Sequence, residues 1–369
     1  MTRIAIKFIS LSAIAAVTSY LIFAPVGIEP VAWQAPENPG LSGVYAQNQT
    51  LSQIQRIALN GGEGPEDLAA DAQGNVYFSL LAGDIQKIDT QGKITQFANT
   101  GGRPLGIEFD TQGNLIVADA FRGLLSIDPQ GKITELVTHV DGLPILYADD
   151  VDVAADGRIY FSDASSKFSA KEYGTYGGSL LDINEHGGHG RVLEYNPATG
   201  VTSILLSGLN FANGVSVSHD QQSLLVIETG SYRVLKTPLN GPERGNIQVL
   251  LDNLPGFPDN LNRGHQGVYW LGLVSPRSAP LDAMSGNPGL RKVVQRLPDF
   301  MRPKAVRFGH LVAFNEEGKV LFSMQDPLGM YGYTTGALEV GDKLYVSSLH
   351  ETALGLTVNP FATQTAGQE

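Results

Sequence analysis

The chain has 369 residues, and 37 acidic residues against 25 lysines and arginines give it a formal net charge of -12. This acidic balance excludes a nucleic-acid backbone as the partner, because like charges repel, and it is compatible with cation binding. The sequence contains no cysteine, which excludes disulfides, a thiolate nucleophile and a cysteine-ligated zinc site.

The first feature along the chain is an apolar run, residues 8–26, that follows Arg3 and Lys7. At about 1.5 Å per residue, a helix over this run approaches the roughly 30 Å thickness of a membrane's hydrocarbon core. We expect residues 1–26 to form an N-terminal hydrophobic helix that is either an uncleaved signal anchor or a cleaved signal peptide. The basic residues place everything after the run outside the cytoplasm, membrane-anchored in the first case and secreted or periplasmic in the second.

Residues 27–52 are rich in proline and lack a regular hydrophobic period, which predicts an extended linker. Residues 52–58 then alternate between polar and apolar, as an outer strand would. We expect residues 53–369 to form one domain in which this strand completes the last structural unit of the chain, because ring closure removes an open sheet edge.

One pattern then recurs six times, in which a pair of residues, with an acid or an amide in four of the six cases, precedes a short apolar run. The pairs and runs are Glu66-Asp67 before 76–78, Leu105-Gly106 before 115–117, Asp149-Asp150 before 159–161, Asn213-Gly214 before 224–227, Asp259-Asn260 before 268–270, and Thr335-Gly336 before 344–346. Repeats of several short strands with glycine-rich turns are typical of β-propellers. The sequence therefore predicts an all-β fold, a six-bladed β-propeller with one blade per repeat.

Two segments interrupt the repeats. Residues 169–190 lose the hydrophobic period and are rich in glycine, serine and tyrosine, whereas residues 275–303 have helical potential near residues 290–297. Long insertions on a rigid scaffold are typical of substrate lids, and the alternative for the first segment is a mobile surface loop. His186 and His189 in that loop are either solvated or a metal clip.

The pairs ahead of the strands carry an acid or an amide in four repeats, namely Glu66, Asp149, Asn213 and the pair Asp259-Asn260. In equivalent blades these residues lie at the start of the innermost strands and surround one axis. Such oxygens, converging without a lysine or arginine, predict a calcium site, because this hard cation takes about six to eight oxygen ligands and offsets the repulsion between carboxylates.

Two of the pairs, Glu66-Asp67 and Asp149-Asp150, are acidic at both positions. Adjacent side chains of an extended segment point in opposite directions, so one member of each pair faces the channel mouth and the other lies deeper. This arrangement allows two cation sites at different depths. The alternative is that the acids only cap turns through local hydrogen bonds, and their common register across four blades favours metal binding.

Several segments together resemble a known family, the strictosidine synthase-like branch of the six-bladed calcium-dependent propellers, which also contains paraoxonases and gluconolactonases. The segments are residues 102–107, 148–153, 159–163, 211–214 and 254–260. The similarity spans nearly the whole domain and extends through residues 31–33 into the N-terminal run, as in the adipocyte plasma membrane-associated members.

The resemblance implies a catalytic Ca²⁺ and a second, structural Ca²⁺. The first would be held by Glu66, Asp149, Asn213, Asp259 and Asn260, and the second by Asp67, Asp150 and the backbone carbonyl of Ile107.

Two departures from the family pattern bear on the chemistry. Leu105 stands where paraoxonases carry a catalytic histidine, and Thr335 stands where strictosidine synthases use a glutamate. We therefore expect a calcium-dependent hydrolase of small-molecule lactones or aryl esters, with Asp259, or failing that Asp149, as general base. The alternatives are an amine-aldehyde condensing enzyme and a non-catalytic, calcium-stabilised binding module.

Overall fold

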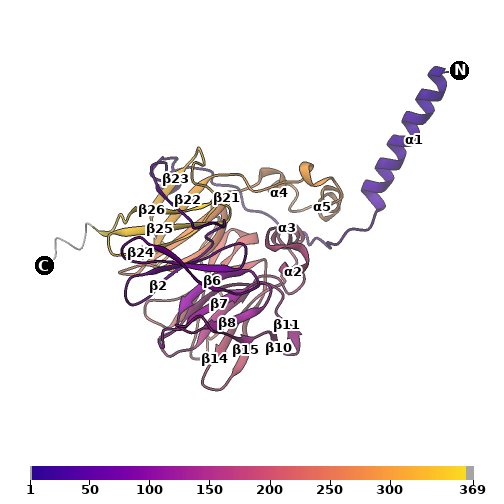
Figure 1. The fold of residues 1–369 in the computed structure, drawn as a ribbon. Helices are drawn as coiled ribbons and strands as arrows, with labels where there is room; N and C mark the ends of the chain where they lie inside the picture. Colours follow the sequence, from indigo (N-terminus) through magenta and orange to yellow (C-terminus); the bar gives the residue numbers. More distant parts are fainter. Residues whose placement is uncertain (1, 363–369) are drawn as a thin grey trace.

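A computed structural model describes residues 2–362 of the protein, with side chains from Leu11 onward. The chain begins with helix α1 (Thr2–Phe23), which projects away from the main body (Figure 1). None of the helices in the described residues combines the length and apolar character that crossing a membrane requires. The signal anchor and the signal peptide therefore both stay predictions.

The main body consists of six four-stranded antiparallel sheets, and the prediction of a six-bladed propeller is confirmed. Blade 1 comprises β2 (Leu68–Ala70), β3 (Val76–Ser79), β4 (Asp84–Ile88) and β5 (Ile94–Asn99), and blade 2 comprises β6 (Pro104–Phe109), β7 (Leu115–Asp119), β8 (Gly123–Ile127) and β9 (Ile133–Val137). Blade 3 comprises β12 (Ala148–Val153), β13 (Ile159–Asp163), β14 (Gly190–Asn196) and β15 (Val201–Leu209). Blade 4 comprises β16 (Ala212–Val217), β17 (Ser223–Glu228), β18 (Arg233–Pro238) and β19 (Gln248–Leu251).

Blade 5 comprises β20 (Gly256–Arg263), β21 (Val268–Pro276), β22 (Gly309–Asn315) and β23 (Val320–Asp326). Blade 6 comprises β24 (Thr334–Val340), β25 (Lys343–Ser348), β26 (Ala353–Val358) and, from the start of the chain, β1 (Gln55–Ala58). A small hairpin, β10 (His139–Val140) and β11 (Leu143–Pro144), and the short 3-10 turns η1 (Gly43–Tyr45) and η2 (Thr229–Ser231) connect these elements. The first strands of successive blades contact one another around a closed ring, so they are the innermost strands.

Tight turns within the first two blades have a repeated structure. Asp71 accepts backbone N–H groups from Gln73 and Asn75, at 3.0 and 2.9 Å, and Gly74 adopts a φ of 81°. Asp89, Asp110 and Asp128 form the same turn. Aspartate suits these turns because its side chain bonds to backbone two residues on, and glycine supplies the positive φ. These four aspartates therefore cap turns through local hydrogen bonds.

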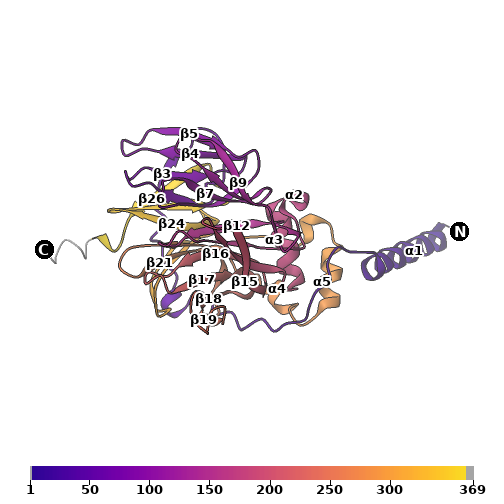
Figure 2. The ribbon, with the colours of Figure 1, turned by 90° about the horizontal axis from the view of Figure 1, so that it is seen from below.

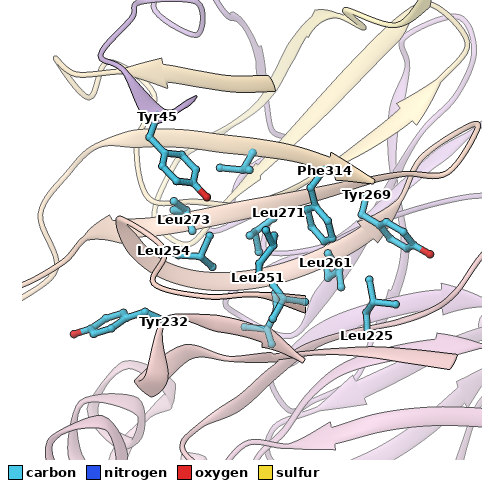
Figure 3. Packing of buried hydrophobic residues seen from close by; sticks show 13 residues of the cluster. Tyr45, Leu225, Tyr232, Leu251, Leu254, Leu261, Tyr269, Leu271, Leu273 and Phe314 are labelled. Atoms are coloured by element: carbon cyan, nitrogen blue, oxygen red, sulfur yellow. The ribbon is translucent and has the colours of Figure 1, made fainter. Parts of the chain in front are cut away.

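Neighbouring blades pack face to face through apolar side chains. Figure 3 shows the cluster that joins blades 4 and 5, in which the rings of Tyr269 and Phe314 stack at 5.4 Å and Leu225 lies opposite. Burying each such side chain contributes about 1.5–3 kcal/mol. These interfaces fix the directions in which the inner strands present their polar residues.

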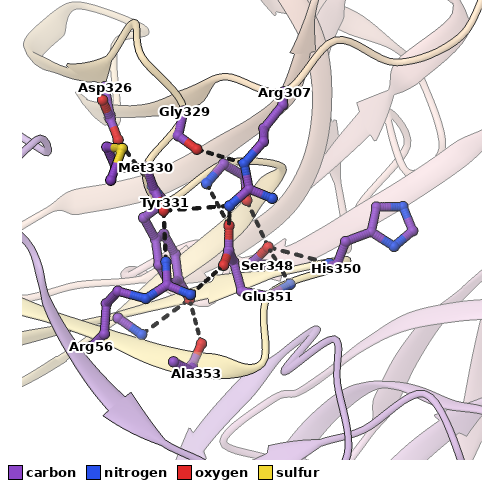
Figure 4. Close-up of polar contacts among 12 residues, drawn as sticks. Arg56, Arg307, Asp326, Gly329, Met330, Tyr331, Ser348, His350, Glu351 and Ala353 are labelled. Carbon is purple, nitrogen blue, oxygen red and sulfur yellow. Dashed lines mark hydrogen bonds and ion pairs between the residues drawn. The ribbon is translucent and has the colours of Figure 1, made fainter.

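The ring closes where β1 pairs with β26, Gln55 opposite Leu356, so the expected closure by the first strand of the domain is confirmed. A polar network supports the closure (Figure 4). The buried carboxylate of Glu351 accepts hydrogen bonds from Arg56 of β1 at 2.6 Å, from Arg307, and from the Gly332 N–H at 3.0 Å. The carboxylate thereby joins segments that lie far apart in the sequence.

Short helices cover one end of the propeller, on the side where α1 emerges (Figure 2). They are α2 (Ala170–Tyr173), α3 (Thr175–Glu185), α4 (Ala279–Ala283) and α5 (Pro288–Gln295), followed by η3 (Asp299–Met301). The expectation of an irregular loop over residues 169–190 was wrong. Two glycines in α3 obscure its helical period, and contacts with the rest of the protein stabilise it, because Ile183 packs against the propeller and Asp182 accepts a hydrogen bond from Ser165 at 2.6 Å. Helical potential near residues 290–297 is confirmed by α5.

The predicted linker is extended and packs closely against the rest of the protein. Ile28 is fully buried, the ring of Trp33 stacks on His186 at 4.0 Å, and the Val31 N–H donates to the carbonyl of Glu185 at 2.8 Å. His186 is therefore buried and not solvated, and His189 bonds to Glu185 at 2.6 Å; a metal clip at these two histidines stays a prediction. We name residues 28–37 the N-terminal strap.

We predict that Glu351→Ala lowers the free energy of unfolding by about 2 kcal/mol, because Arg56, Arg307 and the Gly332 N–H all lose their shared acceptor. Both arginines are partly exposed and regain water, which keeps the loss below that of a fully buried pair. Glu135→Ala, which removes an exposed partner of Arg122, is the control. Chemical denaturation measures both, and equal losses would contradict a role for Glu351 in closure.

Candidate functional site

A cavity of about 810 Å³ lies between the ends of the inner strands and the covering helices α3, α4 and α5. Its walls are mostly apolar or aromatic and include Leu105, Phe121, Tyr147, Leu180, Phe257 and Met284. An apolar cavity of this size, with few polar groups at one end, suits a small organic ligand. The covering helices therefore lie where the sequence predicted a lid.

Polar residues from four blades form the floor of this cavity. Glu66, Asp149, Asn213 and Asp259 all line it, each is at least 94% buried, and the fully buried Asn260 lies against Glu66. The structure thus brings together the five side chains predicted for the first calcium site. The other two blades contribute Leu105 and Thr335 at the equivalent position, as the repeats indicated.

The two amides of the cluster are oriented in the same way. Asn213 donates its Nδ2 to Asp259 Oδ1 at 2.6 Å, and Asn260 donates its Nδ2 to Glu66 Oε1 at 3.0 Å. Each donation leaves the amide oxygen without a partner. Together with Glu66 Oε2 and Asp149 Oδ2, four buried oxygens from four blades accept no hydrogen bond from the described residues.

Four unpartnered oxygens in one buried cluster fit a hard cation. Each buried acceptor without a donor costs about 1–3 kcal/mol, and Ca²⁺ would remove that cost by taking oxygens as ligands. Acidic and histidine side chains alone do not form a metal site, because no three of them in the described residues are close enough together to hold one ion. The amide oxygens of Asn213 and Asn260 would therefore have to contribute.

The carboxyl groups of the floor have strongly perturbed acidities. Burial, followed by the charges of Asp259 and Asp67, raises the pKa of Glu66 well above its usual range. Burial and then Asp259 do the same to the pKa of Asp149. Burial raises the pKa of Asp259 to about 7, against the opposing effect of the Asn213 hydrogen bond. A bound cation would reverse these shifts by favouring the charged forms.

The second predicted site lies deeper along the axis, at a cavity of about 90 Å³ that Asp67, Asp150 and Ile107 line together. Here the carboxylates already have partners. Asp67 accepts the Ile107 N–H and the Asn262 amide, both at 2.9 Å, and Asp150 accepts the Val215 N–H at 2.8 Å. These hydrogen bonds link different blades without a metal, so a structural calcium at this depth stays a prediction.

Sequence reasoning missed Arg103 and gave no role to His350. The expectation that no basic side chain joins the ring was wrong, because Arg103 lines the same cavity next to Glu66 and Asp149. His350 also lines the cavity, and its side chain points away from the Glu351 network (Figure 4). Burial lowers the pKa of His350. The only sequence signal for Arg103 was its place in the segment 102–107, which contributes to the family resemblance but assigns the arginine no role.

Comparisons with known proteins agree with this architecture. The strictosidine synthase family matches residues 149–242, and the strictosidine synthase-like N-terminal family matches residues 43–88. The adipocyte plasma membrane-associated protein of Salmo salar is 34% identical over 364 residues, which cover 92% of this chain and 85% of that protein.

Two solved structures share the fold. A gluconolactonase from Xanthomonas campestris matches with a TM-score of 0.61 and 16% identity, covering 90% of this chain and 98% of its own. A calcium-binding protein, regucalcin, from Agrobacterium tumefaciens matches with a TM-score of 0.56 and 15% identity, covering 86% and 91%.

We predict that Ca²⁺ raises the melting temperature of metal-depleted protein by about 5 °C at a hundredfold excess over its dissociation constant, because only the folded state assembles the oxygens. Asp149→Asn removes one charge from the cluster and should reduce this shift by more than half. Asp182→Asn changes a buried carboxyl on α3, outside the cluster, and should keep the full shift. A wild-type melting temperature that does not respond to Ca²⁺ would contradict the site.

We also predict opposite pH responses with and without the ion. The raised pKa values of Glu66, Asp149 and Asp259 mean that the folded, metal-depleted protein binds protons that the unfolded chain has released. The stability of metal-depleted protein should therefore fall as pH rises from about 4 to about 7. Stabilisation by Ca²⁺ should grow over that range. Melting temperatures at pH 5 and pH 8 test both statements, and a metal-depleted protein that is more stable at pH 8 would refute them.

Proposed function

This chain belongs to the adipocyte plasma membrane-associated protein family of strictosidine synthase-like propellers, and we propose that it is a calcium-dependent hydrolase of lactones or aryl esters. The observation that carries the proposal is the group of four buried oxygens without partners at the floor of a largely apolar cavity. A cation held by these oxygens would lie beside room for an organic substrate. The names of the two similar structures, a gluconolactonase and a calcium-binding protein, support the same direction.

The residues of the floor would bind the ion, and the walls would bind the substrate. Glu66, Asp149, Asn213 and Asn260 would hold Ca²⁺ through their free oxygens, and Asp259 would add an oxygen from the cavity side. When bound, the ion polarises a substrate carbonyl and stabilises the negative charge that develops on its oxygen. The apolar walls orient the rest of the substrate and exclude water from it.

Asp259 is our choice for the general base, with Asp149 as the alternative. Asp259 faces the cavity, and the Asn213 hydrogen bond to its Oδ1 fixes the carboxylate in place. A pKa of about 7 in the absence of the ion is close to the pH at which a base works well. The carboxylate would take a proton from the attacking water and return it to the leaving oxygen.

A non-catalytic, calcium-stabilised binding module is the second candidate. The residues at the two positions where related enzymes carry catalytic groups favour this candidate. Leu105 is apolar, and the Thr335 hydroxyl already bonds to the Glu66 backbone carbonyl at 2.6 Å and to the Ser347 hydroxyl at 2.7 Å. Amine-aldehyde condensation has less support. Glu339, the only glutamate near the start of the last blade, bonds to Trp270 and His265 away from the cavity.

We further propose that the N-terminal run attaches the domain to a membrane or directs its export, with the propeller outside the cytoplasm. The name of the Salmo salar relative supports membrane association. The end of α1 is tied to the covering helices, since Arg296 donates to the carbonyls of Ala24 and Leu21 at 2.6 and 2.9 Å. An anchored domain would then hold its cavity near the membrane surface.

We predict calcium-dependent turnover of at least one member of a panel of lactones and aryl acetates, abolished by a chelator. Asp259→Asn should lower kcat by about 10²–10⁴-fold, because the substitution removes the proton acceptor. Activity should rise with pH and level off at or below about pH 7, since a bound cation lowers the pKa of Asp259.

Melting temperatures separate this function from the binding module. If the site is catalytic, Asp259→Asn loses turnover even when enough Ca²⁺ is added to restore the melting temperature. If the ion is only structural, the same change mainly lowers the melting temperature. Absence of calcium-dependent turnover above background across the panel would remove the hydrolase hypothesis.

A further inference from the structure

Arg103 occupies a fixed position at the cavity floor, directly ahead of β6. Its N–H donates to Asp119 Oδ1 at 3.0 Å, and its carbonyl accepts the Ala120 N–H at 2.8 Å. Asp119 itself is fully buried. The backbone of Arg103 is therefore held from both sides, and its side chain, 2% exposed, enters the cavity from a rigid base.

The guanidinium of Arg103 is poorly satisfied for a buried charge. Its one hydrogen bond runs from Nη1 to the adjacent carbonyl of Pro104 at 3.1 Å, and its Nε has no partner among the described residues. Other buried arginines are better paired. Arg191 bonds to Asp163 and a carbonyl, and Arg277 bonds to Asp282, Asn253 and a carbonyl. Desolvating a charge without such partners is costly.

Unpaired donors and unpaired acceptors therefore line the same cavity without bonding to each other. Glu66 Oε2 and Asp149 Oδ2 lack hydrogen bonds although the guanidinium of Arg103 lies near enough to interact with both charges. If Arg103 served only to neutralise these carboxylates, it would be expected to hydrogen-bond to them, because an arginine and a carboxylate pair readily through two parallel hydrogen bonds. The open acceptors suit a cation, and the open donors suit an anionic group.

We propose that Arg103 is the anion-recognising residue of the cavity and binds the carboxylate of an amphiphilic ligand whose apolar part lies along the aromatic walls. This role for Arg103 rests on the proposed function in one respect only, that the substrate binds in this cavity. Such a carboxylate has two sources, an acidic group carried by the intact substrate or the acid that ester hydrolysis releases. A planar guanidinium with free N–H groups recognises either one.

The test uses the full chain and two probes that differ in charge, phenylacetate and its neutral counterpart phenylacetamide. Calorimetry on calcium-loaded wild-type protein should show roughly tenfold to hundredfold tighter binding of phenylacetate. Arg103→Met should remove most of this preference, and Arg103→Lys should restore part of it, because it keeps the charge without the planar fork. Arg122→Met changes a partly exposed arginine of the same blade that does not line the cavity; it is the matched control and should bind as wild type.

Calcium affinity provides a second measurement that needs no turnover. Removing the positive charge of Arg103 should leave calcium binding unchanged or tighter, because the guanidinium lies beside the proposed ligands. An Arg103→Met protein that keeps the full preference for phenylacetate would overturn the proposal, since the cation alone would then recognise the anion. Loss of calcium binding in both Arg103 variants would also overturn it, by making the residue part of the metal framework.

Kinetics distinguish the two sources of the carboxylate once a hydrolysed substrate is known. An increase in KM confined to carboxylate-bearing esters in Arg103→Met identifies the intact substrate as the source. Weaker product inhibition alone identifies the released acid. If no ester is hydrolysed but the preference for phenylacetate depends on Arg103, the hydrolase proposal fails and the anion site stands.

Discussion

The structure depends on how six inner strands that meet on one axis accommodate the acidic residues they carry. Glu66, Asp149 and Asp259 converge in a buried region where burial and mutual repulsion raise their pKa values. In a low-dielectric interior such groups must be protonated, hydrogen-bonded or paired with a cation. At the cavity floor, carboxylate and amide oxygens remain free to bind a cation. At the second predicted site, Asp67 and Asp150 are stabilised by hydrogen bonds instead.

At the second predicted site, hydrogen bonds from the backbone stabilise buried carboxylates without a metal. The inner strands of blades 2 and 4 change register before Ile107 and Val215, which frees the N–H groups of these residues from their own sheet. Asp67 and Asp150 of the preceding blades accept those N–H groups. No side chain fits at the residue just before either N–H group, because a Cβ at Gly106 would lie 2.3 Å from Asp150 Oδ1 and a Cβ at Gly214 would lie 2.7 Å from the Asp259 carbonyl oxygen. Glycine at these two positions is thus a packing requirement.

The number of blades, their closure and the residues of the floor could be predicted because the repeats make equivalent positions visible in the sequence. The partners of those residues could not. That Asp67 meets the Ile107 N–H depends on a local change of strand register, and Arg103 enters the cavity only because Asp119 holds its backbone. Helix α3 was missed for a related reason. Its buried face carries Asp182 and Glu185, whose partners lie elsewhere in the chain, so it has no clear apolar period in the sequence.

The N-terminal strap connects the outermost element of the protein to the cavity. Arg291 of α5, 1% exposed, donates to carbonyls of Val31 in the strap, Asn184 in α3 and Ser285 after α4. One buried guanidinium therefore fastens both lid segments to the chain that leads from α1. Arg296, directly after α5, donates in the same way to the carbonyls of Leu21 and Ala24 at the end of α1. The chain between α1 and the propeller is thus hydrogen-bonded to the covering segments at two successive points, and these contacts add to the few that separate helices over a cavity make with one another.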